Sequence, residues 1–248
     1  MNNFNKRFSI TSVVSLITSV VSLIISVTCV IAIIISGVGY RLGLWHFSTG
    51  FSIVEWTVLA ALISLGLAII GIYKTKIKGV NRGFFVATLS ICLVFPIVAF
   101  SVYWEKSSDF YPPINDITTD IEEPPSFWEV PDPVDYPGIK TANLQITAYP
   151  EISPIKLSMT VDQAFDRALT LAKNNKWEIV SIDKTEGQIE ATDSSFLYGF
   201  KDDIVIRVQA VDGGAKIDMR SRSRVGKIDR GANARRILKF IEAFNNNE

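Results

Sequence analysis

The stretch that decides the fold of the C-terminal half is Asp203-Ile-Val-Ile-Arg-Val-Gln-Ala-Val-Asp-Gly-Gly-Ala-Lys-Ile-Asp-Met-Arg-Ser-Arg-Ser-Arg224. Asp212-Gly213 in its middle is a strong signal for a two-residue type I′ turn, so we expect a β-hairpin. A one-residue slip would place Ile206 opposite Arg220, so the apolar alternation fixes the register. The expected pairs are Val208–Ile217 and Ile206–Met219 on the core side, and Arg207–Asp218 and Asp203–Arg222 on the other side.

Signals on both sides of the hairpin extend it into a two-layer domain. Thr160-Val-Asp-Gln163 is a capping box that opens an amphipathic helix. A second such helix is expected at 231–244, with Arg235, Arg236 and Lys239 facing water. The expected strands are 177–183, 188–194, 203–211 and 214–224, with Ile182 opposite Ile189 and Val180 opposite Ala191. The sequence therefore predicts an α+β soluble domain at 155–248, a four-stranded antiparallel sheet with helices on one face.

The first 104 residues have a different composition. They contain seven of the 25 Lys and Arg residues and a single acid, Glu55. The charge-free runs 8–40, 56–73 and 83–104 suit membrane-spanning helices, which need about 20 residues each. We therefore predict three transmembrane helices, at about 12–36, 56–73 and 83–104. A cleaved signal peptide is the alternative for the first run, but its apolar core is only about 7–15 residues long.

The cations that flank these spans predict the orientation in the lipid bilayer. Six of the seven lie before the first span or between the second and third: Lys6, Arg7, Lys74, Lys76, Lys78 and Arg82. The first loop has only Arg41, together with Glu55. By the positive-inside rule the N-terminus is cytoplasmic and residues 105–248 are periplasmic. We expect a multi-pass protein of the bacterial inner membrane.

Small residues form a stripe on the first span. They recur at spacings of three and four: Ser12, Ser15, Ser19, Ser22 and Ser26. Such stripes let helix backbones approach closely in lipid. Two interpretations stay open: packing within one three-helix bundle, or association with a second copy or another membrane protein. No span has a charged residue at its centre, which argues against an ion channel or pump.

A proline-rich segment, 105–154, separates the two halves. It contains nine of the ten prolines, and it is acidic. Such a stretch is typical of an extended linker, because proline disrupts helices and inner strands. Tyr111, Phe127, Trp128 and Tyr136 make it too aromatic for a free linker, so we expect it to lie against the domain surface.

Composition also limits the chemistry of the domain. The net charge of zero argues against a nucleic-acid partner. From Glu105 onward there is no His and no Cys, which excludes Ser-His-Asp and Cys-His catalysis and the usual zinc ligands. No nucleotide-binding glycine motif is present, and we expect neither cofactor nor metal nor catalytic residue. The only candidates for a carboxylate pair are Glu190, Asp193, Asp202 and Asp203, and the acids and amide near 115–123 lack the spacing of a calcium loop.

A cluster of cations is the main candidate for a binding site. Arg220, Arg222 and Arg224 alternate, so their side chains project from one face of the sheet, and a glycine-containing loop then leads into a helix N-terminus. Guanidinium groups and helix N-termini both suit phosphate or carboxylate, so an anionic small molecule or lipid headgroup is the expected ligand. The candidate residues are Arg207, Arg220, Arg222, Arg224, Lys227 and Asn233. The alternative is that the arginines pair internally with Asp202, Asp203, Glu190 and Asp218, or with the acidic segment that precedes the domain.

Three motifs resemble a known family. They are Phe200-Lys-Asp-Asp-Ile-Val-Ile-Arg207, Arg220-Ser-Arg-Ser-Arg-Val-Gly226 and Asp229-Arg-Gly-Ala-Asn-Ala-Arg-Arg-Ile237. Together with Pro112–Asp120 and Pro124–Phe127, they are similar to the domain of unknown function 1499 family over about 110–245. The family often has His where this chain has Asn115. The resemblance implies a shared fold, and membrane spans are common in its bacterial members, but it implies no activity.

The leading functional hypothesis is a non-enzymatic binding or accessory role at the cell envelope. A structural subunit that docks other membrane proteins is the first alternative. A carboxylate-dependent enzyme is the second.

Overall fold

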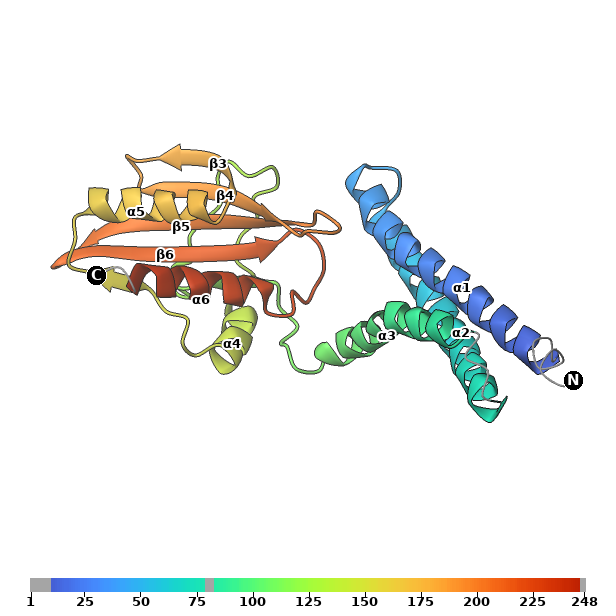
Figure 1. Cartoon of the computed structure of the whole chain (residues 1–248). Coiled ribbons are helices and arrows are strands. Elements are labelled where there is room, and N and C mark those ends of the chain that lie inside the picture. The colour runs from blue at the N-terminus through green and yellow to red at the C-terminus, as the bar shows by residue number, and fades with distance from the viewer. Residues whose placement is uncertain (1–9, 79–82, 246–248) are drawn as a thin grey trace, which may run out of the picture. The chain divides into compact units, whose positions relative to one another are not determined.

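The computed structural model describes residues 10–78 and 83–245. The chain divides into two compact units, Met1–Lys106 and Ser107–Glu248, and each is described by itself (Figure 1). The orientation was predicted in part from residues that lie outside the described ones, namely Lys6, Arg7 and Arg82. The side chains of Ser12, Lys76 and Lys78 are not described either.

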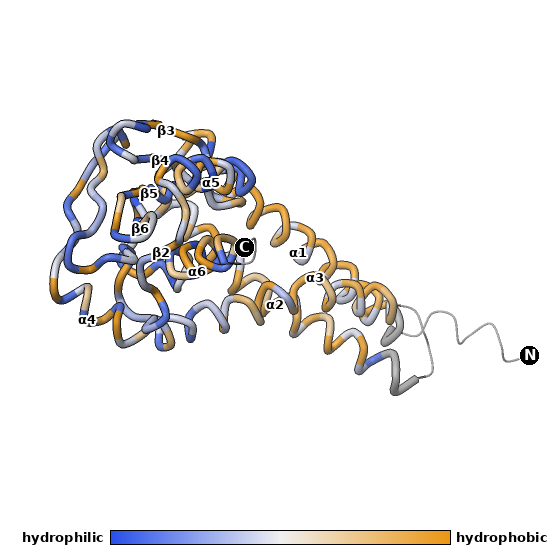
Figure 2. The backbone as a smooth tube through the Cα atoms, turned by 90° about the vertical axis from the view of Figure 1, so that its left-hand side faces the viewer, coloured by the Kyte–Doolittle hydropathy of each residue, from blue (hydrophilic) through white to orange (hydrophobic). Residues whose placement is uncertain are grey.

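The first unit consists of three long helices, α1 (Ile10–Arg41), α2 (Phe47–Lys78) and α3 (Phe84–Ser107). All three are apolar along most of their length (Figure 2), and each is long and apolar enough to cross a membrane. Helix α2 begins nine residues before the predicted span at 56–73. The prediction stopped at Glu55, but this residue is exposed and does not interrupt the helix.

The serine stripe of α1 is buried against the other two helices. Ser22 and Ser26 meet Ser64 of α2 and Ser90 of α3, with Oγ–Oγ distances of 2.9 Å for Ser22–Ser64 and 2.6 Å for Ser26–Ser90. Further along, the Ser15 hydroxyl donates to the Gly71 carbonyl oxygen at 3.0 Å. The stripe therefore packs within the bundle, and its association with a second copy or another protein stays a prediction.

The second unit is built on one antiparallel sheet of six strands, where four were predicted. The strands are β1 (Asp116–Thr118), β2 (Ile155–Leu157), β3 (Glu178–Asp183), β4 (Gln188–Ser194), β5 (Lys201–Val211) and β6 (Gly214–Ser223). Their order is β1-β6-β5-β4-β3, and β2 also pairs with β6. The prediction missed β1 and β2 because three residues are too few to show an alternating pattern.

The central hairpin has the predicted register. Val208 lies opposite Ile217 and Arg207 opposite Asp218. The prediction was wrong at one pair of the neighbouring hairpin, where Ile179 rather than Val180 lies opposite Ala191. A bulge between Ile179 and Ser181 shifts the register there, and sequence alternation does not reveal such an irregularity.

Two helices cover one face of the sheet and enclose the core. Helix α5 (Val161–Asn174) begins with the predicted capping box, in which Thr160 and Gln163 exchange hydrogen bonds. Helix α6 (Ala232–Asn245) lies beside it (Figure 1), and both contribute to a core with Ile189, Ile206 and Ile217 of the sheet. A shorter helix, α4 (Ile139–Ala148), lies within the segment that was expected to be a linker.

Candidate functional site

The other face of the sheet is polar and buried. Its side chains come from four strands and point away from the helices α5 and α6. They are Asp116, Thr118, Gln188, Glu190, Thr192, Asp203, Arg207, Asp218, Arg220 and Arg222, all buried except Arg207, which is partly buried. Residues 119–136, called the strap below, cover this polar face. Phe127 and Val130 of the strap pack on Val205, so the expectation that the aromatic segment lies against the domain is confirmed. Charged groups buried in this way are stable only when each has a partner.

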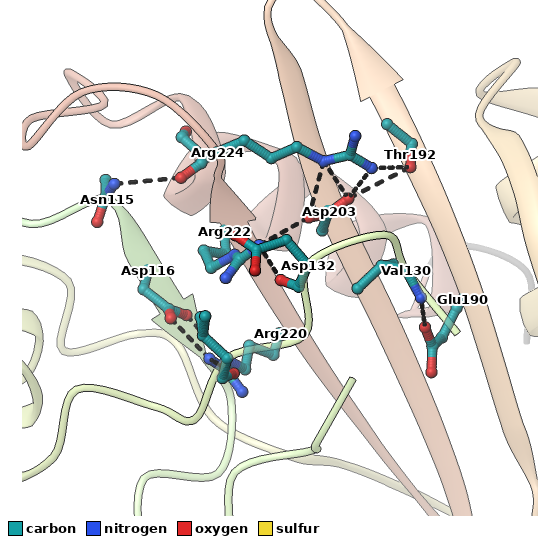
Figure 3. Close-up of polar contacts among 12 residues, drawn as sticks. Asn115, Asp116, Val130, Asp132, Glu190, Thr192, Asp203, Arg220, Arg222 and Arg224 are labelled. Carbon is teal, nitrogen blue, oxygen red and sulfur yellow. Dashed lines mark hydrogen bonds and ion pairs between the residues drawn. The ribbon is translucent and has the colours of Figure 1, made fainter. Parts of the chain in front are cut away.

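Arg220 is the most deeply buried cation, with a side chain only 1% exposed. Its guanidinium donates to both carboxylate oxygens of Asp116, from Nε at 2.9 Å and from Nη2 at 2.8 Å (Figure 3). Two strap carbonyl oxygens, those of Pro125 and Val134, accept from it at 3.1 Å each. This one guanidinium thus joins strand β1 and two points of the strap to strand β6. The rings of Phe127 and Tyr136 lie within 4.8 Å and 5.6 Å of its Cζ atom.

Asp203 holds the other two arginines of the alternating motif. Arg222 donates to its Oδ2 at 3.0 Å, and Arg224 donates to its Oδ1 at 2.6 Å (Figure 3). The Asp203 side chain is fully buried, whereas that of Arg224 is 27% exposed. The hydrogen bond that Arg224 donates to Asp203 raises the pKa of Arg224 above its usual value. Arg222 also donates to the strap carbonyl oxygen of Asp132 at 2.8 Å.

Asp218 is the centre of a second charge cluster on the polar face. Arg207 donates to its Oδ2 at 3.0 Å, and Lys216 Nζ lies 3.1 Å from the same oxygen. Asp120 of the strap accepts from Lys216 at 2.6 Å. Burial acts to raise the pKa of Asp120, but hydrogen bonds from the Glu123 backbone and from Lys216 outweigh it and lower that pKa.

Glu190 anchors the middle of the strap without any cation. Its carboxylate accepts from the backbone N–H groups of Trp128, Glu129 and Val130 at 2.6, 3.0 and 3.0 Å. Gln188 donates to it at 2.9 Å. Three convergent backbone donors satisfy a buried carboxylate as well as a guanidinium does, so this acid binds the chain itself.

Asn233 lies on the helix-covered face, on the opposite side of the sheet from the side chains of Arg220 and Arg222. Its side chain is buried and links Ser221 with the Asn115 carbonyl oxygen, at 2.7 and 3.0 Å. Arg236, one turn further along α6, was expected to face water, but it is 11% exposed and bridges Asp193 and Asp202 at 2.9 and 2.7 Å. These two acids lie directly opposite each other on β4 and β5, so a shared cation offsets their repulsion.

Two of the six predicted binding residues remain accessible at the surface. Lys227 is exposed in the connection between β6 and α6, and Arg224 is exposed in part. Asn115 donates to the carbonyl oxygens of Ser223 and Gly226 at 3.2 and 2.6 Å, so it fixes this connection. In residues 10–78 and 83–245 no group of three or more His, Cys, Asp or Glu side chains has the geometry to hold a metal ion.

Burial affects the titration of two groups near Arg220. It raises the pKa of Asp116, although the hydrogen bonds and charge of Arg220 act in the opposite direction. It also raises the pKa of Tyr136 to about 12, and the charge of Asp116 adds to that shift.

The sequence indicated the acidic segment as one possible partner of the arginines but did not single out Asp116, and it did not identify Glu190 as the anchor of the strap. Asp116 lies in a segment that was expected to be a linker, about 100 residues before Arg220, and no local pattern links the two. One signal could have indicated a buried role for Glu190. It stands between the apolar residues Ile189 and Ala191 of a predicted strand, so its side chain lies on the same sheet face as the arginines.

The architecture defines the class: three apolar helices long enough to cross a membrane, followed by an antiparallel α+β domain. A family model described as "Protein of unknown function (DUF1499)" matches residues 116–244, more than half of the chain. The chain belongs to this family, as the three motifs indicated. No curated protein and no solved structure matches it.

Proposed function

We propose that this chain is a multi-pass protein of a bacterial inner membrane whose C-terminal domain lies in the periplasm and acts by binding rather than by catalysis. The cation-rich connection between α2 and α3 supports this orientation, because positive loops remain in the cytoplasm. The family membership is consistent with this proposal, because the family has no assigned activity.

The observation that carries the proposal is the neutralisation of the carboxylates on the polar face. Asp116, Asp203 and Asp218 each contact an arginine, and Glu190 accepts from three backbone N–H groups. A general acid or base needs access to substrate and a pKa near the working pH. These four groups lie instead beneath the strap and stabilise the fold, which leaves the outer surface for binding.

The anion-binding part of this proposal rests on Arg224 and Lys227. Both are accessible, and they lie at one end of the sheet, where the connection to α6 begins. Arg224 donates to the buried Asp203 from Nε and Nη2, but part of its side chain faces the surface. Arg207, Arg220 and Arg222 already donate to buried carboxylates and to strap carbonyls, and Asn233 is fully buried. A ligand that bound the three arginines would have to displace the strap, and Asn233 lies on the opposite, helix-covered face.

Calorimetric titration of the full chain in nanodiscs of neutral lipid with inorganic phosphate tests this site. We expect measurable binding that weakens at least tenfold when Arg224→Gln and Lys227→Gln are combined. Lys156→Gln, which removes an exposed cation on β2, is the matched control and should bind as the unmodified chain does. Equal affinity in all three proteins, or no binding by the unmodified chain, would contradict the anion site.

A structural subunit is the second candidate, and a groove in the first unit favours it. An apolar groove of about 560 Å³ lies between α1 and α2, lined by Ile24, Thr28, Ala32, Ile53 and Trp56 among others. A groove of this size accommodates a few apolar side chains from a helix of another membrane protein. Purification in mild detergent should then yield a stoichiometric partner, and Ala32→Phe, which fills the groove, should release it. Purification of the chain alone would argue against this second role.

A further inference from the structure

Three segments of the second unit meet at one end of the sheet. The loop 195–200 joins β4 to β5, and Ser194 lies opposite Lys201 at its base. The connection 224–231 leaves β6 at the same end, because Asp202 pairs with Ser223. Residues 107–115 arrive there too, since Asp116 lies opposite Arg222. Figure 1 shows the β4–β5 loop and the β6–α6 connection at this end, called the loop end below.

The loop end exposes large aromatic side chains. The β4–β5 loop reads Ser195-Phe-Leu-Tyr-Gly-Phe200, and the Phe196 side chain is 94% exposed. Phe110, in the segment before β1, is 81% exposed. Single exposed apolar residues are common, but two phenylalanines at one end of a domain, one of them in a loop rich in aromatic residues, mark an interaction surface.

The β4–β5 loop is ordered by its own hydrogen bonds. The Ser195 N–H donates to the Phe200 carbonyl oxygen at 2.8 Å, and the Gly199 N–H donates to the Ser195 carbonyl oxygen at 2.9 Å. The rings of Tyr198 and Phe200 stack with centroids 5.1 Å apart. The loop therefore presents Phe196 from a preformed turn, which lowers the entropic cost of inserting it into a partner.

Chain connectivity places Phe110 close to the end of the third candidate membrane span. The third candidate membrane span ends at Ser107. Phe110 follows three residues later, and three residues reach at most about 11 Å. The Ser107 hydroxyl accepts from Arg230 Nε at 3.0 Å, so the start of the second unit is fixed to the 224–231 connection.

Cations lie around the aromatic groups at the same end. Lys227 is exposed beside the 224–231 connection. Lys173 and Lys176 are exposed near the start of β3, whose first residue, Glu178, lies opposite Thr192 close to the base of the loop. Aromatic side chains with flanking lysines suit the boundary between acyl chains and headgroups, where the rings enter the apolar layer and the ammonium groups stay in water.

We infer that the loop end is a membrane-contact surface, at which Phe110 and Phe196 insert into the bilayer that α3 crosses. The domain then rests on the lipid with its loop end down, held at two points as well as by its tether to α3. This inference goes beyond the binding role proposed above, because it needs no anion site and no particular orientation of the chain.

Spin labelling of the full chain tests the inference. In a Cys29→Ala, Cys92→Ala background, a nitroxide is attached at Phe196→Cys and, in a second protein, at Asp212→Cys in the turn at the opposite end of the sheet. Both are reconstituted in nanodiscs of phosphatidylcholine and phosphatidylglycerol at a ratio of about 7:3. Power saturation then compares the collision rates with oxygen, which partitions into lipid, and with a water-soluble nickel chelate.

We expect oxygen to dominate at position 196 and the nickel chelate to dominate at position 212. Nickel access at both positions would overturn the inference, because residue 196 would then lie in water. Low access of both reagents at position 196 would also overturn it, since it indicates contact with protein. Phosphate binding through Arg224 and Lys227 is measured separately, so failure of one proposal does not imply failure of the other.

Discussion

At the scale of single residues, the domain is organised by buried charges that contact the chain itself. Arg220 and Arg222 donate to strap carbonyls, and Glu190 accepts from strap N–H groups. Proline residues suit this arrangement, because they keep a carbonyl acceptor but lack the N–H that a strand would need. Side chains of the sheet thus replace the backbone ladder that the strap cannot form.

Asp203→Asn tests the importance of this network. The substitution leaves the charge of Arg222 without its buried partner, and removal of one member of a buried pair costs about 3–5 kcal/mol. We expect the denaturation midpoint of the domain to fall accordingly. Asp193→Asn is the control, because that acid is 37% exposed and Arg236 keeps Asp202, so we expect a loss of at most about 1 kcal/mol. Equal losses of stability in the two variants would show that the ion pairs of Asp203 do not stabilise the domain.

Two tyrosines predict a loss of stability at alkaline pH. The pKa values of Tyr136 and Tyr149 are raised to about 12, mainly by burial, from an ordinary value of 10.0. The folded state therefore holds these protons more tightly than the unfolded state, and the stability they contribute is present below pH 10 and lost between pH 10 and 12. Thermal unfolding across this range should show a falling midpoint. Tyr136→Phe combined with Tyr149→Phe should make that fall shallower, and an unchanged pH profile would contradict the assignment.

At the scale of elements, sequence reasoning succeeded where a pattern repeats and failed where contacts are distant. The β5–β6 hairpin was predicted down to its register, because Asp212-Gly213 and the alternation of Ile206 and Val208 leave one pairing. Strand β1 was missed, since its pairing with β6 depends on partners about 100 residues away. The same distance explains which ion pairs of the site were predicted. The Arg207–Asp218 pair lies within one hairpin and was expected. Asp116 lies about 100 residues before Arg220, and the sequence did not single it out as the partner.

Packing of α1 on α2 gives a prediction with a built-in control. A Cβ atom at Gly71 would lie 2.5 Å from Ser19 Oγ, whereas one at Gly66 would have nothing within 4 Å. We expect Gly71→Leu to separate the two helices and lower the thermal unfolding midpoint in detergent. Gly66→Leu should leave the midpoint unchanged or raise it, because Leu favours a helix over Gly by up to about 1 kcal/mol. The same loss in both variants would contradict the packing.

At the scale of the whole molecule, three helices able to cross a membrane are joined to a domain whose charged face is closed by its own chain. The first unit supplies three helices able to cross a membrane, and the second supplies the fold of its family. Since the polar face is neutralised internally, the binding proposals concern other surfaces: the loop end of the domain, with Arg224 and Lys227, and the apolar groove of the helices.

The side of the membrane on which the domain lies decides which partners it can meet, and cysteine labelling measures it directly. The full chain carries Asp212→Cys in the Cys29→Ala, Cys92→Ala background, and intact spheroplasts are treated with a membrane-impermeant maleimide. Lys76→Cys, between the second and third spans, is the control and should react only after lysis. A periplasmic domain requires that position 212 reacts before lysis. If position 212 reacts only once the cells are opened, the domain is cytoplasmic and the proposed role at the envelope is wrong.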